Sequence, residues 1–323
     1  MLSKTTHAYA HSRSGDLQLD IYLSADRSSI DNTTPAFIYF HGGGLVAFNR
    51  EFIPTHIVQS CVQRKWPLIS VDYNLLPQAK GEDLVSNICD AYRFVRGNLC
   101  RIADKGDGIW ENIIVGGNSA GAYMAYQAGL NLEPKPLALF CLYGPGNCMG
   151  KFWSSNHIIG NAPIEFDEVS WFLEAPMSAG HTPPDMAFYP ESLLDDGRPN
   201  PDFKMPVNPE PFNEPAFLYN WLVQENKLPP LVSDIEVPYS SPAWRQLPKT
   251  IIIHGTNDQI VPYEAATNLF KAIGSETAIL FTVPDAPHAF DQNLLHGDKD
   301  LEIVEQAWKA LDQIVRDLKR ASA

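Results

Sequence analysis

The sequence predicts an α/β protein whose mostly parallel sheet carries helices on both faces. Short runs of β-branched and aromatic residues alternate with longer runs of helical periodicity, which is the pattern of such folds. Most of the short runs are apolar throughout, as expected for strands that are buried on both faces. Hydrophobic residues make up 45% of the 323 positions, so we expect one elaborated globular domain with a large core.

Seven short runs are predicted to form the sheet. The first, Asp16–Leu23, alternates apolar and polar residues, which is typical of a strand at the edge of a sheet. The other six are short and mostly apolar, as buried parallel strands are. These six runs are Ala36–Phe40, Leu68–Val71, Asn112–Val115, Leu137–Leu142, Thr250–Ile253 and Ala278–Val283.

Four longer stretches are predicted to be helices, because apolar residues recur in them at helical spacing. The last of them has the clearest apolar stripe, which either packs on the sheet or meets a second copy of the chain. The oligomeric state is therefore open, with a dimer as one alternative. The predicted helices are Glu82–Arg101, Ala120–Leu130, Tyr263–Ile273 and Leu301–Arg320.

Prolines concentrate in one part of the chain. Fifteen of the 26 prolines lie between Ala162 and Ala243. Stretches such as Asp202–Pro215 are too broken by proline to sustain regular helices or central strands, so we expect an insertion into the α/β core. The expected core comprises residues 1–150 and 242–323, and the expected cap or lid comprises residues 151–241.

The same segment is rich in aromatic residues. Such side chains bury large areas and suit a lid over an apolar pocket, but an insertion of this size also needs aromatic residues for a small core of its own. The sequence leaves both interpretations open. Four of the seven tryptophans fall between Lys151 and Trp244, the last of them just past the expected lid: Trp153, Trp171, Trp221 and Trp244.

Charge and cysteine content narrow the function classes. The 38 acidic and 24 basic residues give a net charge of −14, which argues against nucleic acid or an anionic membrane surface as a partner. We find no apolar run long enough for a membrane span and no secretory signal in the first 23 residues. The five cysteines lack metal-site spacing. We therefore expect a cytoplasmic protein with free thiols, no metal and no cofactor, acting on a small molecule.

A serine stands between a predicted strand and a predicted helix in the run Gly117–Gly121, which reads GNSAG. A tight turn here needs very small residues two positions before and after the serine, because those positions approach each other closely. The N-terminus of the following helix favours negative charge that develops on a bound substrate. This context favours a nucleophile at Ser119, with an ordinary tight turn as the alternative.

Three consecutive glycines follow the strand Ala36–Phe40 in the run His41–Gly44, which reads HGGG. They cost backbone entropy on folding, but they let bare amide groups approach an oxygen closely, as an oxyanion hole requires. A phosphate cradle or a hinge is the alternative, and the P-loop form of a cradle fails because no Gly-Lys-Ser/Thr follows. His41 is interpreted as a hydrogen-bonded support and not as the base.

An acid and a base candidate follow the last two predicted strands. Asp258 lies in HGTNDQIVP, where an acid could orient a histidine and stabilise its charged form, although loop aspartates are commonly turn formers. His288 follows the last strand and is the base candidate, whereas His296 lies in a polar stretch better suited to solvent. The chain order Ser119, Asp258, His288 is the nucleophile, acid, base order of α/β-hydrolases.

Taken with VDYNLLP at Val71–Pro77 and PHAF around His288, these motifs resemble the hormone-sensitive-lipase-like carboxylesterase branch of the α/β-hydrolases. The resemblance covers about Ala36–Leu142 and Ser241–Arg320. It implies an α/β-hydrolase fold in which the backbone amides of Gly43, Gly44 and Ala120 form the oxyanion hole. This chain departs from the family pattern at three positions, where Asn118, Ala122 and Asn74 replace the usual Asp, Gly and Arg.

The expected reaction is hydrolysis of an ester, lactone or thioester of a small to medium, largely apolar substrate. Ser119, activated by His288 with Asp258 as its partner, would attack the carbonyl carbon and form an acyl-enzyme. Two further classes stay open. The scaffold could instead serve as a dehydratase, cyclase, acyltransferase or formamidase in secondary metabolism, or as a catalytically inert small-molecule receptor.

Overall fold

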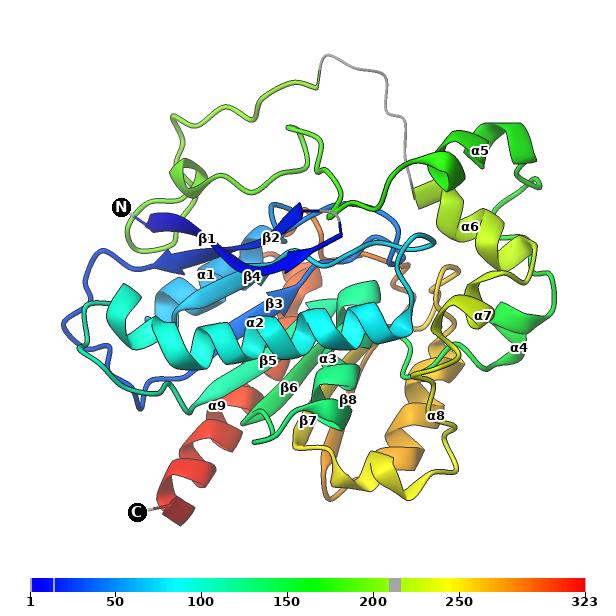
Figure 1. Cartoon of the computed structure of the whole chain (residues 1–323). Helices are drawn as coiled ribbons and strands as arrows, with labels where there is room; N and C mark the ends of the chain where they lie inside the picture. Colours follow the sequence, from blue (N-terminus) through cyan, green and yellow to red (C-terminus); the bar gives the residue numbers. More distant parts are fainter. Residues whose placement is uncertain (1, 14, 209–215, 323) are drawn as a thin grey trace.

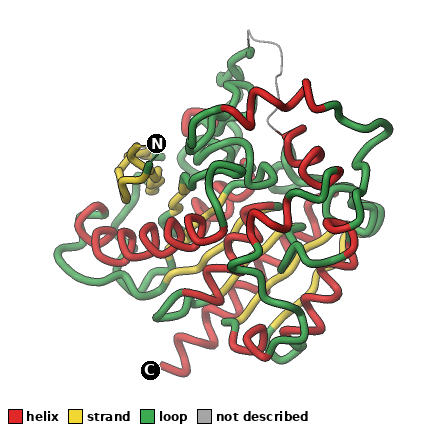
Figure 2. The backbone as a smooth tube through the Cα atoms, turned by 45° about the vertical axis from the view of Figure 1, so that its right-hand side comes forward, coloured by secondary structure: helices red, strands yellow, loops and turns green. Residues whose placement is uncertain are grey.

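An eight-stranded sheet forms the centre of the protein, with helices on both of its faces (Figure 1, Figure 2). The computed structural model describes residues 2–13, 15–208 and 216–322. The strand order is β1-β2-β4-β3-β5-β6-β7-β8, in which β1 and β4 run antiparallel to β2 and all other neighbours are parallel. The strands are β1 (Ser3–Ser12), β2 (Gly15–Leu23), β3 (Ala36–Phe40), β4 (Leu68–Val71), β5 (Ile113–Asn118), β6 (Ala138–Leu142), β7 (Lys249–Gly255) and β8 (Ala278–Val283).

All seven predicted strands are present, and the α/β prediction is confirmed. The sequence does not signal β1, because this strand is largely polar and none of its residues is fully buried. β1 forms the edge of the sheet, and β2 lies between β1 and β4. The predicted edge position of Asp16–Leu23 is therefore wrong.

Helices cover the sheet from both sides, as the alternation of β3 shows. Ala36, Ile38 and Phe40 pack in one apolar cluster with α2, α3 and α8, and Phe37 and Tyr39 pack in a second cluster with α1 and α9. The four predicted helices are present, and α1 is an additional one. These helices are α1 (Thr55–Arg64), α2 (Gly81–Ile102), α3 (Ala120–Asn131), α8 (Tyr263–Ile273) and α9 (Glu302–Ser322).

The apolar stripe of α9 packs on the sheet, which is one of its two predicted uses. Trp308 is fully buried, and its ring centroid lies 4.4 Å from that of Phe140 and 5.4 Å from that of Phe37. The last predicted helix is thus part of the core of the chain.

Short helices interrupt the proline-rich segment and lie together beyond one end of the sheet (Figure 1). The expectation that proline excludes regular helices is therefore wrong for parts of this segment. Residues 202–208 form no helix or strand, as expected. Residues 209–215, the rest of the Asp202–Pro215 stretch, lie outside the described residues. The helices are α4 (Lys151–Ser154), α5 (Phe166–Glu174), α6 (Ala216–Gln224) and α7 (Leu228–Val232).

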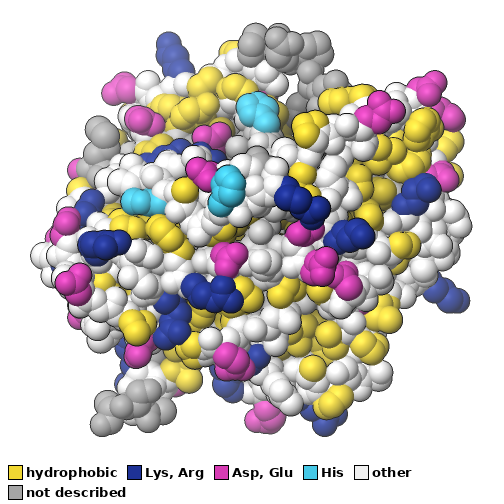
Figure 3. Space-filling view, viewed as in Figure 1, with side chains coloured by type: hydrophobic (Ala, Val, Ile, Leu, Met, Phe, Trp, Pro, Cys, Tyr) yellow, Lys and Arg dark blue, Asp and Glu magenta, His cyan; other side chains and the backbone are white. Residues whose placement is uncertain are grey.

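Surface charge and helix hydrophobicity are the two features of the structure that concern nucleic acid and membranes as partners. On the face shown in Figure 3, acidic and basic side chains are interspersed and no broad basic area is visible. Within the described ranges, none of the helices combines the length and the apolar character needed to cross a membrane.

Candidate active site

Ser119 stands on a sharp turn between β5 and α3. Its φ of 52° and ψ of −119° are unfavourable for a residue with a side chain, so the surrounding packing must hold the turn in place. A Cβ atom on Gly117 would overlap the backbone of Gly121, and a Cβ atom on Gly121 would overlap the carbonyl of Phe40. The close approach expected from the sequence is therefore present, and it leaves Ser119 accessible from the adjoining pocket at the carboxyl edge of the sheet.

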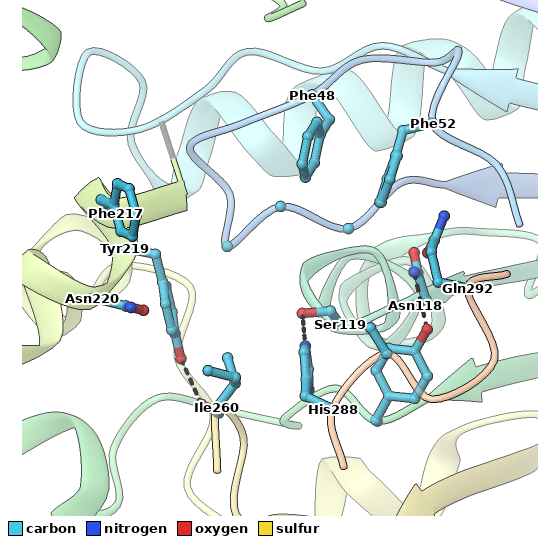
Figure 4. A pocket seen from close by; sticks show the side chains of 15 residues that line it. Phe48, Phe52, Asn118, Ser119, Phe217, Tyr219, Asn220, Ile260, His288 and Gln292 are labelled. Atoms are coloured by element: carbon cyan, nitrogen blue, oxygen red, sulfur yellow. Dashed lines mark hydrogen bonds between the residues drawn. The ribbon is translucent and has the colours of Figure 1, made fainter. Parts of the chain in front are cut away.

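The three predicted side chains of the site come together in one hydrogen-bonded chain. His288 Nε2 lies 2.9 Å from Ser119 Oγ (Figure 4), and His288 Nδ1 lies 2.7 Å from Asp258 Oδ2. The other oxygen of Asp258 accepts hydrogen bonds from the backbone amides of Ile260 and Val261, both at 2.9 Å. The parallel order of β5, β7 and β8 brings these loops to one edge of the sheet.

Neighbouring groups stabilise the ionised form of Asp258. Burial alone would raise the pKa of this carboxyl, but hydrogen bonds from His254 and His288 outweigh burial and hold the pKa well below its ordinary value. His254 Nε2 lies 3.2 Å from the same Oδ2 atom that faces His288. A charged Asp258 favours the tautomer with hydrogen on His288 Nδ1, which leaves Nε2 free to accept the proton of Ser119.

The three residues predicted to supply oxyanion donors line cavities that Ser119 also lines. Gly43 and Gly44 have φ values of 106° and 62°, which favour glycine. Ala120 is the first residue of α3, so its amide has no partner within the helix. Among the described residues, none of these three amides donates to another protein group. They are therefore available to an oxygen of a bound molecule.

His41 takes a supporting position beneath the glycine run. It is fully buried, its Nδ1 lies 2.7 Å from the carbonyl oxygen of Gly42, and its ring stacks on Tyr73 with 4.3 Å between centroids. Burial lowers the pKa of His41 to about 3, so the ring is neutral. This agrees with the interpretation of His41 as a support.

The predicted solvent position of His296 is wrong. Only 14% of its side chain is exposed, and its Nδ1 lies 3.2 Å from Glu305 Oε1. Its Nε2 atom lies 2.8 Å from Ser60 Oγ of α1. No local pattern signals this contact, because it joins two segments far apart along the chain.

A buried polar network that the sequence does not reveal lies behind Ser119. Asn118 accepts a hydrogen bond from the Tyr39 hydroxyl at 2.7 Å and donates one to the Tyr143 oxygen at 3.2 Å. Tyr143 in turn donates to Asp291, and His56 Nε2 lies 2.7 Å from the other oxygen of Asp291. The site therefore requires both an acceptor and a donor at position 118, which Asn supplies and an ionised Asp would not.

A pocket with a volume of about 240 Å³ opens beside Ser119 and His288 (Figure 4). Aromatic side chains dominate its walls, and two of them come from α6, so part of the 151–241 segment lines the pocket. Other aromatic residues of that segment are buried, including Trp153 and Trp221, so both interpretations of its composition apply. The lining includes Phe48, Phe52, Phe217, Tyr219, Ile260 and Gln292.

No metal site accompanies these groups in the described parts of the chain, where no three His, Cys, Asp or Glu side chains are arranged to hold an ion. The chemistry available from the chain itself is that of a hydroxyl activated by a histidine, next to free amide donors.

Comparison with known proteins identifies the fold. A protein-family model described as alpha/beta hydrolase fold matches residues 37–192. A crystal structure of an alpha/beta hydrolase superfamily protein from Enterococcus faecalis superposes with a TM-score of 0.66. It is 16% identical in sequence, and the match covers 98% of this chain and 99% of the bacterial one.

Several known proteins are similar in sequence, among them a polyketide synthase and a carboxylesterase. The non-reducing polyketide synthase adrD of Penicillium rubens is 25% identical over 321 residues, which cover 90% of this chain and 13% of the synthase. The 3-O-acetylpapaveroxine carboxylesterase CXE1 of Papaver somniferum is 28% identical over 161 residues, which cover 45% of this chain and 50% of the esterase. The matched residues thus span a small part of the synthase and about half of the esterase.

Proposed function

Because the chain belongs to the α/β-hydrolase superfamily, we propose that it is a serine hydrolase that cleaves carboxylic esters of small to medium, largely apolar substrates. One observation carries the proposal: the hydrogen-bonded chain from Asp258 through His288 to Ser119 ends beside an aromatic pocket. The similarity to a plant carboxylesterase supports the same reaction class.

The reaction proceeds in two halves. Ser119 Oγ attacks the carbonyl carbon while His288 Nε2 takes its proton, and the amides of Gly43, Gly44 and Ala120 donate to the resulting oxyanion. The carbon–oxygen bond to the alcohol breaks, and His288 returns the proton to the leaving oxygen. Water, deprotonated by His288, then attacks the acyl-serine, and the acid leaves as the proton returns to Ser119 Oγ.

The similarity to a polyketide synthase favours a second candidate, in which the substrate is an ester or thioester of a polyketide. The same groups would serve, because a thiolate leaving group accepts its proton from His288 in the same way. The two candidates differ in the acyl group that the protein must accommodate.

Ser119→Ala tests the reaction class. We expect kcat/KM for p-nitrophenyl acetate to fall by about 10⁴-fold or more, because the variant lacks the attacking oxygen. Circular dichroism and the melting temperature serve as the folding control. Hydrolysis by the folded variant at the rate of the unchanged protein would rule out this mechanism.

A further inference from the structure

Two cavities of very different size meet at Ser119. The larger one has a volume of about 240 Å³ and the smaller one about 20 Å³. Ser119, Gly44 and Tyr219 line both, so Tyr219 forms the wall between them. Of the two, His288 lines the larger cavity and Ala120 lines the smaller one. The sides of the serine are therefore chemically different.

The route of proton transfer from His288 decides which part of the substrate lies in which of the two cavities. The leaving alcohol oxygen must receive its proton from His288 Nε2, so the alcohol extends into the cavity that His288 lines. The acyl substituent points away from the leaving group and must occupy the other side. We propose that the smaller cavity receives the acyl group and admits acetyl but not longer chains, so that the substrates are acetate esters of bulky apolar alcohols. This inference rests on the proposed ester hydrolysis.

The size of the smaller cavity suits a single methyl group. A volume of about 20 Å³ holds about one water-sized group, and a methyl is only slightly larger. Each further methylene would need a wall to move. The smaller cavity is lined on its far side by Tyr123, Cys148, Trp153 and Leu228.

The wall formed by Tyr219 is fixed from two directions. Trp153 Nε1 donates to the Tyr219 hydroxyl at 3.0 Å, and that hydroxyl donates to the carbonyl oxygen of Ile260 at 3.2 Å (Figure 4). Tyr219 also packs closely on the glycine run, since a Cβ atom on Gly44 would lie 2.7 Å from the Tyr219 Cβ. Rotation of Tyr219 would break both hydrogen bonds, so the wall does not yield easily to a longer acyl chain.

The far wall is fixed by a partly buried acid. The Tyr123 hydroxyl donates to Glu236 Oε1 at 2.8 Å, and the backbone amide of Cys148 donates to Glu236 Oε2 at 2.7 Å. Trp153 and Leu228, on α4 and α7, are 3% and 1% exposed. Because these two side chains are buried, the far wall has little room to retreat.

The larger cavity suits a ring-bearing alcohol. Phe48 and Phe52 stack with 4.1 Å between their centroids, and Phe217 faces them from α6 (Figure 4). Aromatic walls of this kind favour flat apolar groups. The asymmetry between the cavities also bears on the second candidate function, because a polyketide acyl group would not fit the smaller cavity.

A pair of isomeric esters tests the assignment directly. Benzyl acetate places methyl on the acyl side and the ring on the alcohol side, and methyl phenylacetate reverses them. Both release simple primary alcohols of similar acidity, so a large difference in rate reflects how well each half of the ester fits its cavity. We expect kcat/KM for benzyl acetate to be at least about tenfold higher than kcat/KM for methyl phenylacetate. We also expect kcat/KM for p-nitrophenyl acetate to be at least about tenfold higher than that for p-nitrophenyl butyrate.

The outcomes separate the inference from the function it rests on. Faster cleavage of methyl phenylacetate, or of the butyrate, would overturn the acyl assignment while leaving ester hydrolysis intact. Failure to cleave any of the four esters would contradict the proposed function as well.

Variants of the small cavity give a second readout. Trp153→Ala should raise the butyrate-to-acetate ratio of kcat/KM by about tenfold, since it removes a wall and frees Tyr219. Leu228→Val enlarges the same cavity with less risk to folding and should shift the ratio in the same direction. Phe52→Ala is the matched control in the larger cavity, and it should change the preference among alcohols but not the acyl ratio. An unchanged ratio in the folded Leu228→Val variant, or an equal shift in Phe52→Ala, would overturn the assignment.

Discussion

Replacing Glu236 by Gln should remove a specific pH dependence from the stability of the protein. Glu236 is partly buried beside Tyr123 and Cys148 of the small cavity, and burial raises its pKa from 4.5 to about 7 despite the hydrogen bonds from these two residues. The folded protein therefore keeps a proton on Glu236 between pH 4.5 and 7, where the unfolded chain has lost it. The contribution to stability is complete below about pH 4.5 and is lost as the pH rises through 7.

The magnitude follows from the same two pKa values. The difference between 4.5 and about 7 corresponds to at most about 3 kcal/mol of unfolding free energy. Gln imitates the protonated acid, because its oxygen accepts from the Cys148 amide while its NH₂ group donates to the Tyr123 oxygen. The variant should therefore lack this pH dependence of the unfolding free energy.

Urea unfolding of both proteins at pH 5 and pH 8 measures the effect. From pH 5 to pH 8, the unfolding free energy of the unchanged protein should fall by up to about 3 kcal/mol more than that of Glu236→Gln. The contributions of the other titrating groups are common to both proteins and cancel in this difference. Equal losses in the two proteins would refute the reasoning, and so would a larger loss in the variant.

Three further substitutions probe the site, and a fourth, in α2, serves as a control. Asp258→Asn should lower kcat for p-nitrophenyl acetate by about 10⁴-fold, because His288 would no longer be held in the tautomer that accepts from serine; activity near that of the unchanged protein would contradict this role. Gly121→Ala should destabilise the fold by about 3 kcal/mol or more, because its methyl overlaps a backbone carbonyl, whereas Gly97→Ala in α2 meets nothing within 4 Å and should raise the melting temperature slightly. Asn118→Asp should cost about 1 to 3 kcal/mol in thermal unfolding, since it removes the donor to Tyr143, and an unchanged melting temperature would contradict the buried network.

The sequence predicts the parts of the site that local patterns determine. Glycines two positions from Ser119 signal a tight turn, and the parallel topology then brings the loops with Asp258 and His288 to the same edge of the sheet. The order of the motifs along the chain was therefore enough to anticipate their meeting. Motif order and strand topology predict this meeting without any information on side-chain packing.

The remaining parts depend on contacts between distant positions. α1 escaped prediction because its buried face includes His56, Gln59 and Ser60, which hide the apolar stripe. The link between His56 and Asp291 joins residues 235 positions apart, and no local pattern signals it. The same holds for the wall at Tyr219, whose position depends on Trp153 and on the loop after β7.

The most direct test of the central proposal is to identify the residue that a fluorophosphonate modifies. Incubation of the intact protein with the probe, followed by mass spectrometry of the whole chain and of its peptides, should give one adduct on Ser119 and concurrent loss of esterase activity. Ser119→Ala should remain unmodified. A folded protein that stays unmodified would favour an inert receptor, and an adduct elsewhere that abolishes activity would contradict Ser119 as the nucleophile.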